Sequence, residues 1–288
     1  MNTNSRTKKN WVATAVMTVI AFTPLYSASA QSDDNDDFGV WTTIEASKKI
    51  NKKIKIDFEA ELRTIEGVDD IERASFGAGV NYKATKWLKA SAGYVFIYSH
   101  SPEEKKIKVD DVLGTENFGD FYDYNIDHDY WTERHRFHLT LTGEYKLGRL
   151  EFSLRERLQY TRTNSAFTDE SKYRWEPQMD EISYEELHPV LNVEKAPELK
   201  ESKHNTTLRS RLTVKWDISG CKITPFASAE LYTRLDDWKR YDKVRYRLGA
   251  SYKINKDNSI SLYYIHQNVN EKNEPKIHAI GLGYSVDL

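Results

Sequence analysis

The sequence predicts an all-β protein: a single antiparallel transmembrane β-barrel of about 10–12 strands with long extracellular loops. Three observations support this fold: apolar and polar side chains alternate, most alternating segments have ten residues or more, and short and long connections take turns. Alternation with a period of two residues is typical of a strand whose two faces meet different surroundings. In IKIDFEAELRTI, residues 54–65, one face is uncharged, and the other face carries a charged residue at every second position from 55 to 63.

The first 30 residues have the layout of a secretory signal. They combine a basic segment, an apolar run over residues 11 to about 25 and the small triplet Ala28-Ser29-Ala30. Such a segment is removed after export. The apolar run is shorter than the about 20 residues that a membrane helix needs. We therefore assign residues 1–30 to a cleaved signal and residues 31–288 to one barrel domain.

The mature chain is mildly acidic. Removing the signal takes away three positive charges and no negative one, so the formal net charge falls from −2 to −5. This balance provides no basic footprint for nucleic acid. Cys221 is the single cysteine, so the fold cannot depend on an internal disulfide. The sequence after residue 30 has no run of 18 apolar residues, which leaves a barrel as the way to cross a bilayer.

Strand length separates the membrane interpretation from a soluble one. A tilted strand that crosses a bilayer needs about 9–11 residues, whereas strands of globular proteins average about 5–6. Bacterial single-chain barrels normally have an even strand number. We therefore expect that one strand is missing, near residues 118–126, or that one has been divided in two. The eleven alternating segments cover residues 38–47, 54–65, 73–84, 87–98, 132–147, 149–163, 205–217, 222–234, 242–254, 258–268 and 276–288.

The connections after every second predicted strand are longer than the others, and the two longest cover residues 99–131 and 164–204. Outer-membrane barrels have short periplasmic turns and longer external loops. The second long connection is rich in acidic residues and holds three of the seven prolines, which argues against a compact core. We therefore expect both to be external loops. Because loops carry the binding function of a rigid scaffold, a surface-binding barrel is the main alternative to a channel.

The faces of the strands are assigned with the apolar side chains toward lipid and the charged ones toward the lumen. Tryptophans near strand ends, such as Trp87, Trp131 and Trp216, fit the aromatic girdles of a membrane barrel. In a barrel of this size long opposite charges should pair across the lumen, so we expect a narrow or plugged passage and no wide pore. The predicted lumen charges are Glu45, Asp57, Glu59, Glu61, Arg63, Arg134, Arg136, Arg155, Arg157, Arg209, Arg211, Glu230, Arg245 and Arg247.

One constellation is similar to the start of a calcium-binding loop. The segment DYNIDHD places carboxylate or amide oxygens at every second position. The pattern then fails, because His128 stands where glycine is required and Arg134 where a bidentate glutamate is required. We favour an acidic, aromatic external loop over a calcium site, and we expect no cofactor. The candidate ligands are Asp123, Asn125, Asp127 and Asp129.

A catalytic role would need a nucleophile within reach of a base. Outer-membrane phospholipases and lipid A deacylases often carry His-x-Ser on one strand face, and none of the eight histidines begins that triplet. His100 directly precedes Ser101, which places the two on opposite faces of an extended chain. We expect a barrel without enzymatic activity. A lipid-modifying hydrolase remains the alternative function, and a secreted soluble β-sandwich the alternative fold.

Several segments in order carry a family resemblance: FGVWTTIEAS, IDFEAELR, GVNYKATKWLKASAGY, ERHRF, LRSRL and RYRLGASYKI. With these the chain resembles an uncharacterised outer-membrane β-barrel family, a bacterial domain of unknown function. The resemblance implies a location in the outer membrane of a Gram-negative bacterium and supplies no catalytic residue. The partners to expect are outer-membrane lipid and the barrel-assembly machinery, with the ligand unknown.

Overall fold

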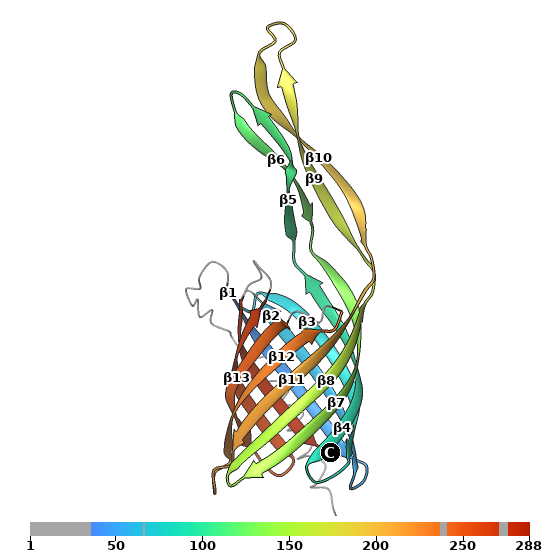
Figure 1. Cartoon of the computed structure of the whole chain (residues 1–288), viewed down its shortest axis with the longest axis vertical. Coiled ribbons are helices and arrows are strands. Elements are labelled where there is room, and N and C mark those ends of the chain that lie inside the picture. The colour runs from blue at the N-terminus through green and yellow to red at the C-terminus, as the bar shows by residue number, and fades with distance from the viewer. Residues whose placement is uncertain (1–35, 66, 237–240, 271–275) are drawn as a thin grey trace, which may run out of the picture. The chain divides into compact units, whose positions relative to one another are not determined.

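The computed structural model describes residues 36–65, 67–236, 241–270 and 276–288, so the predicted signal segment lies outside it. The described chain forms a closed barrel and a separate four-stranded sheet (Figure 1). It contains no helix of the length and apolar character that a membrane span requires. The strands are β1 (Asp36–Lys49), β2 (Ile54–Ile65), β3 (Asp70–Lys83), β4 (Leu88–Ser101), β5 (Glu104–Thr115), β6 (Gly119–Asp127), β7 (Tyr130–Leu147), β8 (Leu150–Thr163), β9 (Ala166–Met179), β10 (Glu186–Lys200), β11 (Lys203–Trp216), β12 (Ile223–Arg234), β13 (Tyr241–Lys253), β14 (Asn258–Val269) and β15 (Lys276–Asp287).

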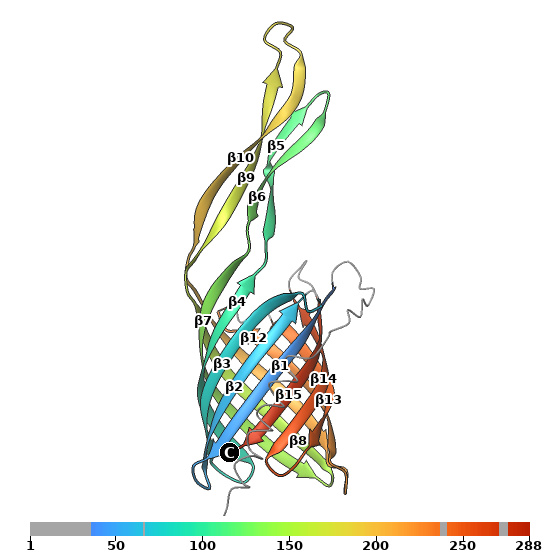
Figure 2. The ribbon, with the colours of Figure 1, turned by 180° about the vertical axis from the view of Figure 1, so that it is seen from behind.

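The barrel has eleven strands in the order β1-β15-β14-β13-β12-β11-β8-β7-β4-β3-β2. Each predicted strand overlaps one of them, so the expectation of a missing or divided strand is wrong. When an odd number of strands alternates in direction, the first and last run the same way. The barrel accordingly closes through a parallel pair, β1 with β15, which makes the sheet mixed instead of purely antiparallel (Figure 2). The segment near residues 118–126 is a strand, β6, but it belongs to the other sheet.

The short turns lie together at one end of the barrel, as predicted from the alternation of connections. Local chemistry explains them. Asn51 and Asn255 each accept hydrogen bonds from two backbone amides of their own turn, a common use of asparagine in turns. Gly148, with φ of +60°, allows β7 to turn directly into β8. The opposite end carries the two long connections.

Both long connections, expected as external loops, are built of strands. Strands β5 and β6 form one hairpin, β9 and β10 form another, and β6 pairs with β9. Pro189 and Pro197 fit because they lie on β10, an edge strand, where an amide on the open side makes no ladder hydrogen bond. Pro177 lies on β9, beyond the residues of β9 that pair with β6. Pro189 lies in the irregularity between Leu187 and Val190. The hairpins therefore satisfy their backbone groups without a compact core.

Exposed fractions in the barrel agree with the assigned faces. On β13, Leu248 is 67% exposed, whereas Arg245 is 4% exposed. On β12, Glu230 is 1% exposed, and on β7 Leu139 is 62% exposed. The apolar side chains form the outside of a closed wall and the charged ones point inward. A soluble β-sandwich would bury the apolar face instead, so this arrangement contradicts the alternative fold.

Placing arginine on the outer face provides a test of this assignment. Leu248→Arg should lower the free energy of unfolding by about 2–4 kcal/mol, the cost of such a charge at the bilayer midplane. Ser251→Arg, three residues along the same strand and facing the lumen, should cost less. Urea unfolding in lipid vesicles measures both, and an equal loss would mean that the two faces are reversed.

Candidate functional site

A layer of buried side chains crosses the lumen in the half of the barrel nearer the long connections. We call it the lumen layer. Its members come from five strands, β1, β2, β11, β12 and β13, and each is at most 8% exposed. Trp41 lies near the start of β1 and Arg63 near the end of β2, and both of these strand ends are at the long connections. The lumen layer consists of Trp41, Arg63, Arg209, Glu230, Tyr232 and Arg245.

Trp41 is the apolar centre of the lumen layer. The guanidinium carbon of Arg63 lies 3.5 Å from the centre of its ring system and that of Arg245 lies 4.7 Å away. Buried contacts of this cation–π type are worth about 2 kcal/mol or more. Ile265 and Ala279, both 0% exposed, complete a small cluster with the indole. Strands that are not neighbours in the barrel thus meet at one side chain.

Glu230 is the ionic centre of the lumen layer. The register places it directly opposite Arg211 on β11 and Arg245 on β13. Its carboxylate accepts hydrogen bonds from Arg155 at 2.6 Å, Arg209 at 3.0 and 3.2 Å, and Arg211 at 2.9 Å. The hydroxyl of Tyr232 donates a further one at 3.0 Å. A buried carboxylate with this many donors is fully satisfied, which is the condition for a favourable buried ion pair.

A second carboxylate, Glu61, binds two arginines. Arg63 donates to both of its oxygens, at 2.9 and 3.0 Å, and Arg73 donates to one at 2.5 Å. Glu61 and Arg63 are two residues apart and share the inner face of β2. Arg73 stands opposite Arg63 on β3. This pair of contacts connects the lumen layer to the wall formed by β2 and β3.

Opposite charges pair in the lumen at Glu61 and Glu230. This pairing does not extend to Glu59, because the register places Glu59 opposite Glu45 and its side chain is exposed. Asp57 lies 3.8 Å from the ammonium of Lys55. The acidic side chains of β2 therefore divide into one that is bound by arginine and two that face the wider, more exposed half of the lumen.

The other predicted arginines have different surroundings. Arg134, on β7, lies near Glu72 and Arg73 of β3. The others contact neutral side chains: Arg136 donates to Thr161, Arg157 to Thr140 and Arg245 to Gln267, and Arg247 lies over the ring of Tyr263.

The predictions missed Trp41, Tyr232, Arg73 and Gln267. All four occupy inward positions by the same period of two that identified the charges. The predicted set contains charged residues only, so it leaves out the two aromatic side chains and the amide. Arg73 is charged, but it is the first residue of the segment predicted at residues 73–84. The alternation itself was the signal that could have found them.

The four calcium candidates do not converge. They lie along β6 and the residue pair after it, where positions two apart are separated by about 6.6 Å. Asp123 accepts from the Trp175 amide, and Asn125 accepts from Arg174. Asp129 lies 3.1 Å from His100. An extended strand sends successive ligands to different partners, whereas a calcium loop curls them around one ion.

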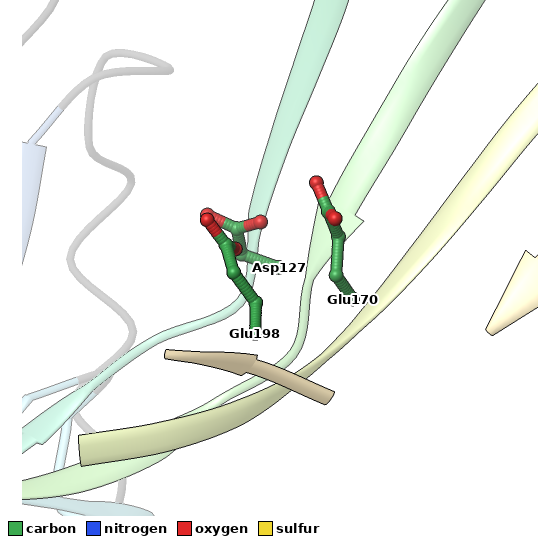
Figure 3. Close-up of side chains that lie close together, drawn as sticks. All are labelled: Asp127, Glu170 and Glu198. Carbon is green, nitrogen blue, oxygen red and sulfur yellow. The ribbon is translucent and has the colours of Figure 1, made fainter. Parts of the chain in front are cut away.

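Asp127 instead meets two glutamates from other strands, Glu170 of β9 and Glu198 of β10, and Figure 3 shows the three side by side. Their ligand atoms lie within 4.8 Å of one another. The ammonium groups of Lys106 and Lys200 each approach Asp127 to 2.7 Å. Burial disfavours the ionised form of Asp127, but these hydrogen bonds outweigh that effect and hold its pKa below the usual value. Lysines therefore supply the positive charge that a cation would bring.

A comparison with known sequence families shows the family to which the chain belongs. The sequence model of the family described as "Protein of unknown function (DUF2490)" matches residues 38–278. A comparison with curated protein sequences finds no match.

Three solved structures show the range of similar barrels. The chain is similar to the CymD monoaromatic hydrocarbon channel, with 9% identity, a TM-score of 0.35 and coverage of 82% of this chain and 84% of that one. It is similar to the translocator domain of the autotransporter NalP from Neisseria meningitidis, with 13% identity, a TM-score of 0.30 and coverage of 92% and 94%. It is also similar to the beta domain of the Bordetella autotransporter BrkA, with 11% identity, a TM-score of 0.31 and coverage of 88% of this chain and 96% of that one. Such values carry no substrate or mechanism to this chain.

Proposed function

We propose that this chain, which belongs to the DUF2490 family of unknown function, is a non-enzymatic, constricted channel of the bacterial outer membrane. The observation that carries the proposal is the lumen layer. Its side chains reach inward from five strands and are almost wholly buried, so they fill the lumen where they meet. A barrel of about this strand number has room for side chains or a small solute, but not for a wide aqueous pore.

The other half of the lumen supports a passage and not a solid plug. Toward the short turns some inward side chains are exposed, as for Glu45 and Glu59. The inner face of β3 there is formed by Gly77 and Gly79, which place no side chain in the lumen. The lumen therefore has exposed inward side chains on one side of a filled level. We propose that this level sets the size of what passes.

A hydrolase is the less supported alternative. His100 and Asp129 form a pair at 3.1 Å, as a catalytic base and its partner would. Ser101 follows His100 on the same extended strand, so its hydroxyl points to the other face of the wall. The pair therefore lacks a nucleophile beside it, and we retain the non-enzymatic proposal.

A surface-binding role has a specific observation in its favour. The four-stranded sheet exposes large apolar side chains on several strands, including Val109 (69%), Phe167 (71%) and Val193 (48%). Apolar side chains on a surface often mark a binding site. This candidate locates function in the sheet, whereas the channel proposal locates it in the barrel.

Removing the sheet separates the two. In a barrel-only variant, short glycine and serine linkers join Ser101 to Tyr130 and Thr163 to Lys203, pairs that are opposite one another in the wall. The barrel's own ladder is complete without the sheet, so we expect the variant to fold and to keep the channel's solute limit. Swelling of liposomes in sugars of increasing size measures that limit for both proteins. A variant that folds but no longer admits small sugars would refute a channel confined to the barrel.

A further inference from the structure

We propose that the lumen holds a site for a small oxyanion, a phosphate or carboxylate group, on the short-turn side of the lumen layer. The site is formed by Arg155 and Arg157 of β8, Arg211 of β11 and Arg247 of β13. The inference rests on the proposed channel, through which an anion would enter, and it names the class of solute that the channel accepts.

The register brings the arginines together. Arg155 stands directly opposite Arg211 and Arg157 directly opposite Arg209. Residues opposite one another in an antiparallel pair are about 4.5–5.5 Å apart, and like charges there are destabilising. Arg247 lies beyond β12 and is repelled most strongly by Arg211 among the charged side chains. Two adjacent like-charged pairs are a costly arrangement unless something else neutralises them.

The acidic side chains near these arginines are too few. Glu230 attracts Arg155, and both Glu59 and Glu230 attract Arg157. Glu230 already serves three guanidinium groups and Tyr232. Glu59 is exposed. Two carboxylates therefore face the four arginines of the site, and one of the two, Glu230, also binds Arg209.

Free donors point to a ligand. Among the described residues, the Nε atoms of Arg155, Arg211 and Arg247 are buried and have no hydrogen-bond partner. A buried donor without an acceptor costs about 1–3 kcal/mol. Guanidinium groups bind phosphate and carboxylate oxygens through two parallel hydrogen bonds. One oxyanion among these arginines would accept from the free donors and reduce the repulsion at the same time.

Arg157 and Arg247 are the arginines to change, because neither donates to Glu230. Arg157 donates from Nε to Thr140 at 3.0 Å, and Arg247 lies over the ring of Tyr263 at 5.7 Å. The test compares wild type with an Arg157→Gln plus Arg247→Gln double variant. Arg162→Gln is the matched control, since Arg162 is exposed on the outer face of β8.

Two readouts use the refolded full chain. The first is the thermal midpoint with inorganic phosphate against chloride at equal ionic strength. We expect phosphate to raise the midpoint of wild type and of Arg162→Gln and to leave the double variant unchanged. Without phosphate the double variant should be at least as stable as wild type, because repulsion is relieved, whereas a purely structural role of the arginines predicts a lower midpoint. The second readout is the reversal potential in a potassium chloride gradient, which should be anion-selective in wild type and severalfold less so in the double variant.

An equal phosphate shift in wild type and the double variant, or no shift in wild type, would overturn the anion site. Cation selectivity of the wild-type channel would also overturn it. A phosphate shift that depends on Arg157 and Arg247 in a protein that conducts no ions would leave the site standing and refute the proposed channel. The two proposals therefore fail on different measurements.

Discussion

Glu230→Gln is expected to lower the free energy of unfolding by about 3–5 kcal/mol, the usual cost of breaking a buried ion pair by removing one partner. The carboxylate is 1% exposed and binds Arg155, Arg209 and Arg211. Glutamine has the same shape, but it has no charge and only one acceptor oxygen. Three guanidinium groups would then share a confined space without the anion that holds them. Urea titration of the refolded barrel in vesicles measures the loss.

The matched control is Glu59→Gln, which removes a lumen carboxylate that is exposed and stands opposite Glu45. Its effect should stay within about 0.5 kcal/mol, as for other exposed substitutions. If the two variants lose the same stability, Glu230 is not the ionic centre that the geometry indicates.

Trp41→Ala is expected to widen the passage and destabilise the barrel together. The indole is 1% exposed and lies between Arg63 and Arg245. Truncating a buried tryptophan costs about 3–5 kcal/mol. The same truncation removes the largest side chain of the lumen layer, so single-channel conductance should rise severalfold.

Trp216→Ala is the control for Trp41→Ala, because Trp216 is 49% exposed at the end of β11. It removes an indole of the same size from outside the lumen and should leave conductance unchanged. A rise in both variants would show that the loss of a tryptophan loosens the whole barrel. No rise in either would show that Trp41 does not limit the passage.

The barrel could be predicted from the sequence because each wall strand has an apolar outer face and a polar inner face. This difference produces an alternation of apolar and polar residues with a period of two, as in β2 and β13. The alternation indicates both where the strands lie and which face each residue occupies. The eleven predicted segments correspond to the eleven strands of the barrel, although an even number was expected. Period two carries no information on how the first and last strands meet, and here they pair in parallel.

The four-stranded sheet was not predicted, and its surroundings explain why. Both faces of β5, EKKIKVDDVLGT, carry exposed side chains, so no alternation is required. The acidic residues and prolines of residues 164–204 are typical of irregular chain. The edge position of β10 makes Pro189 and Pro197 compatible with a strand, and only the pairing order reveals that position.

The candidate site was predicted in part. The inward charges were found, but their partners depend on register and on closure of the wall. Glu230 meets Arg211 because they are opposite in the β11–β12 ladder. Trp41 meets Arg245 because β1, β15, β14 and β13 curve around one lumen. Neither relation can be derived from a strand considered by itself.

The most direct test of a lumen constricted by side chains is the single-channel conductance of the unmodified, refolded protein in a planar bilayer. The lumen layer predicts small conductance steps, well below those of a wide porin, since Trp41, Glu230 and their arginines fill one level of the barrel. Conductance steps as large as those of a wide porin would contradict the account, because they require an open lumen at the level where these side chains meet.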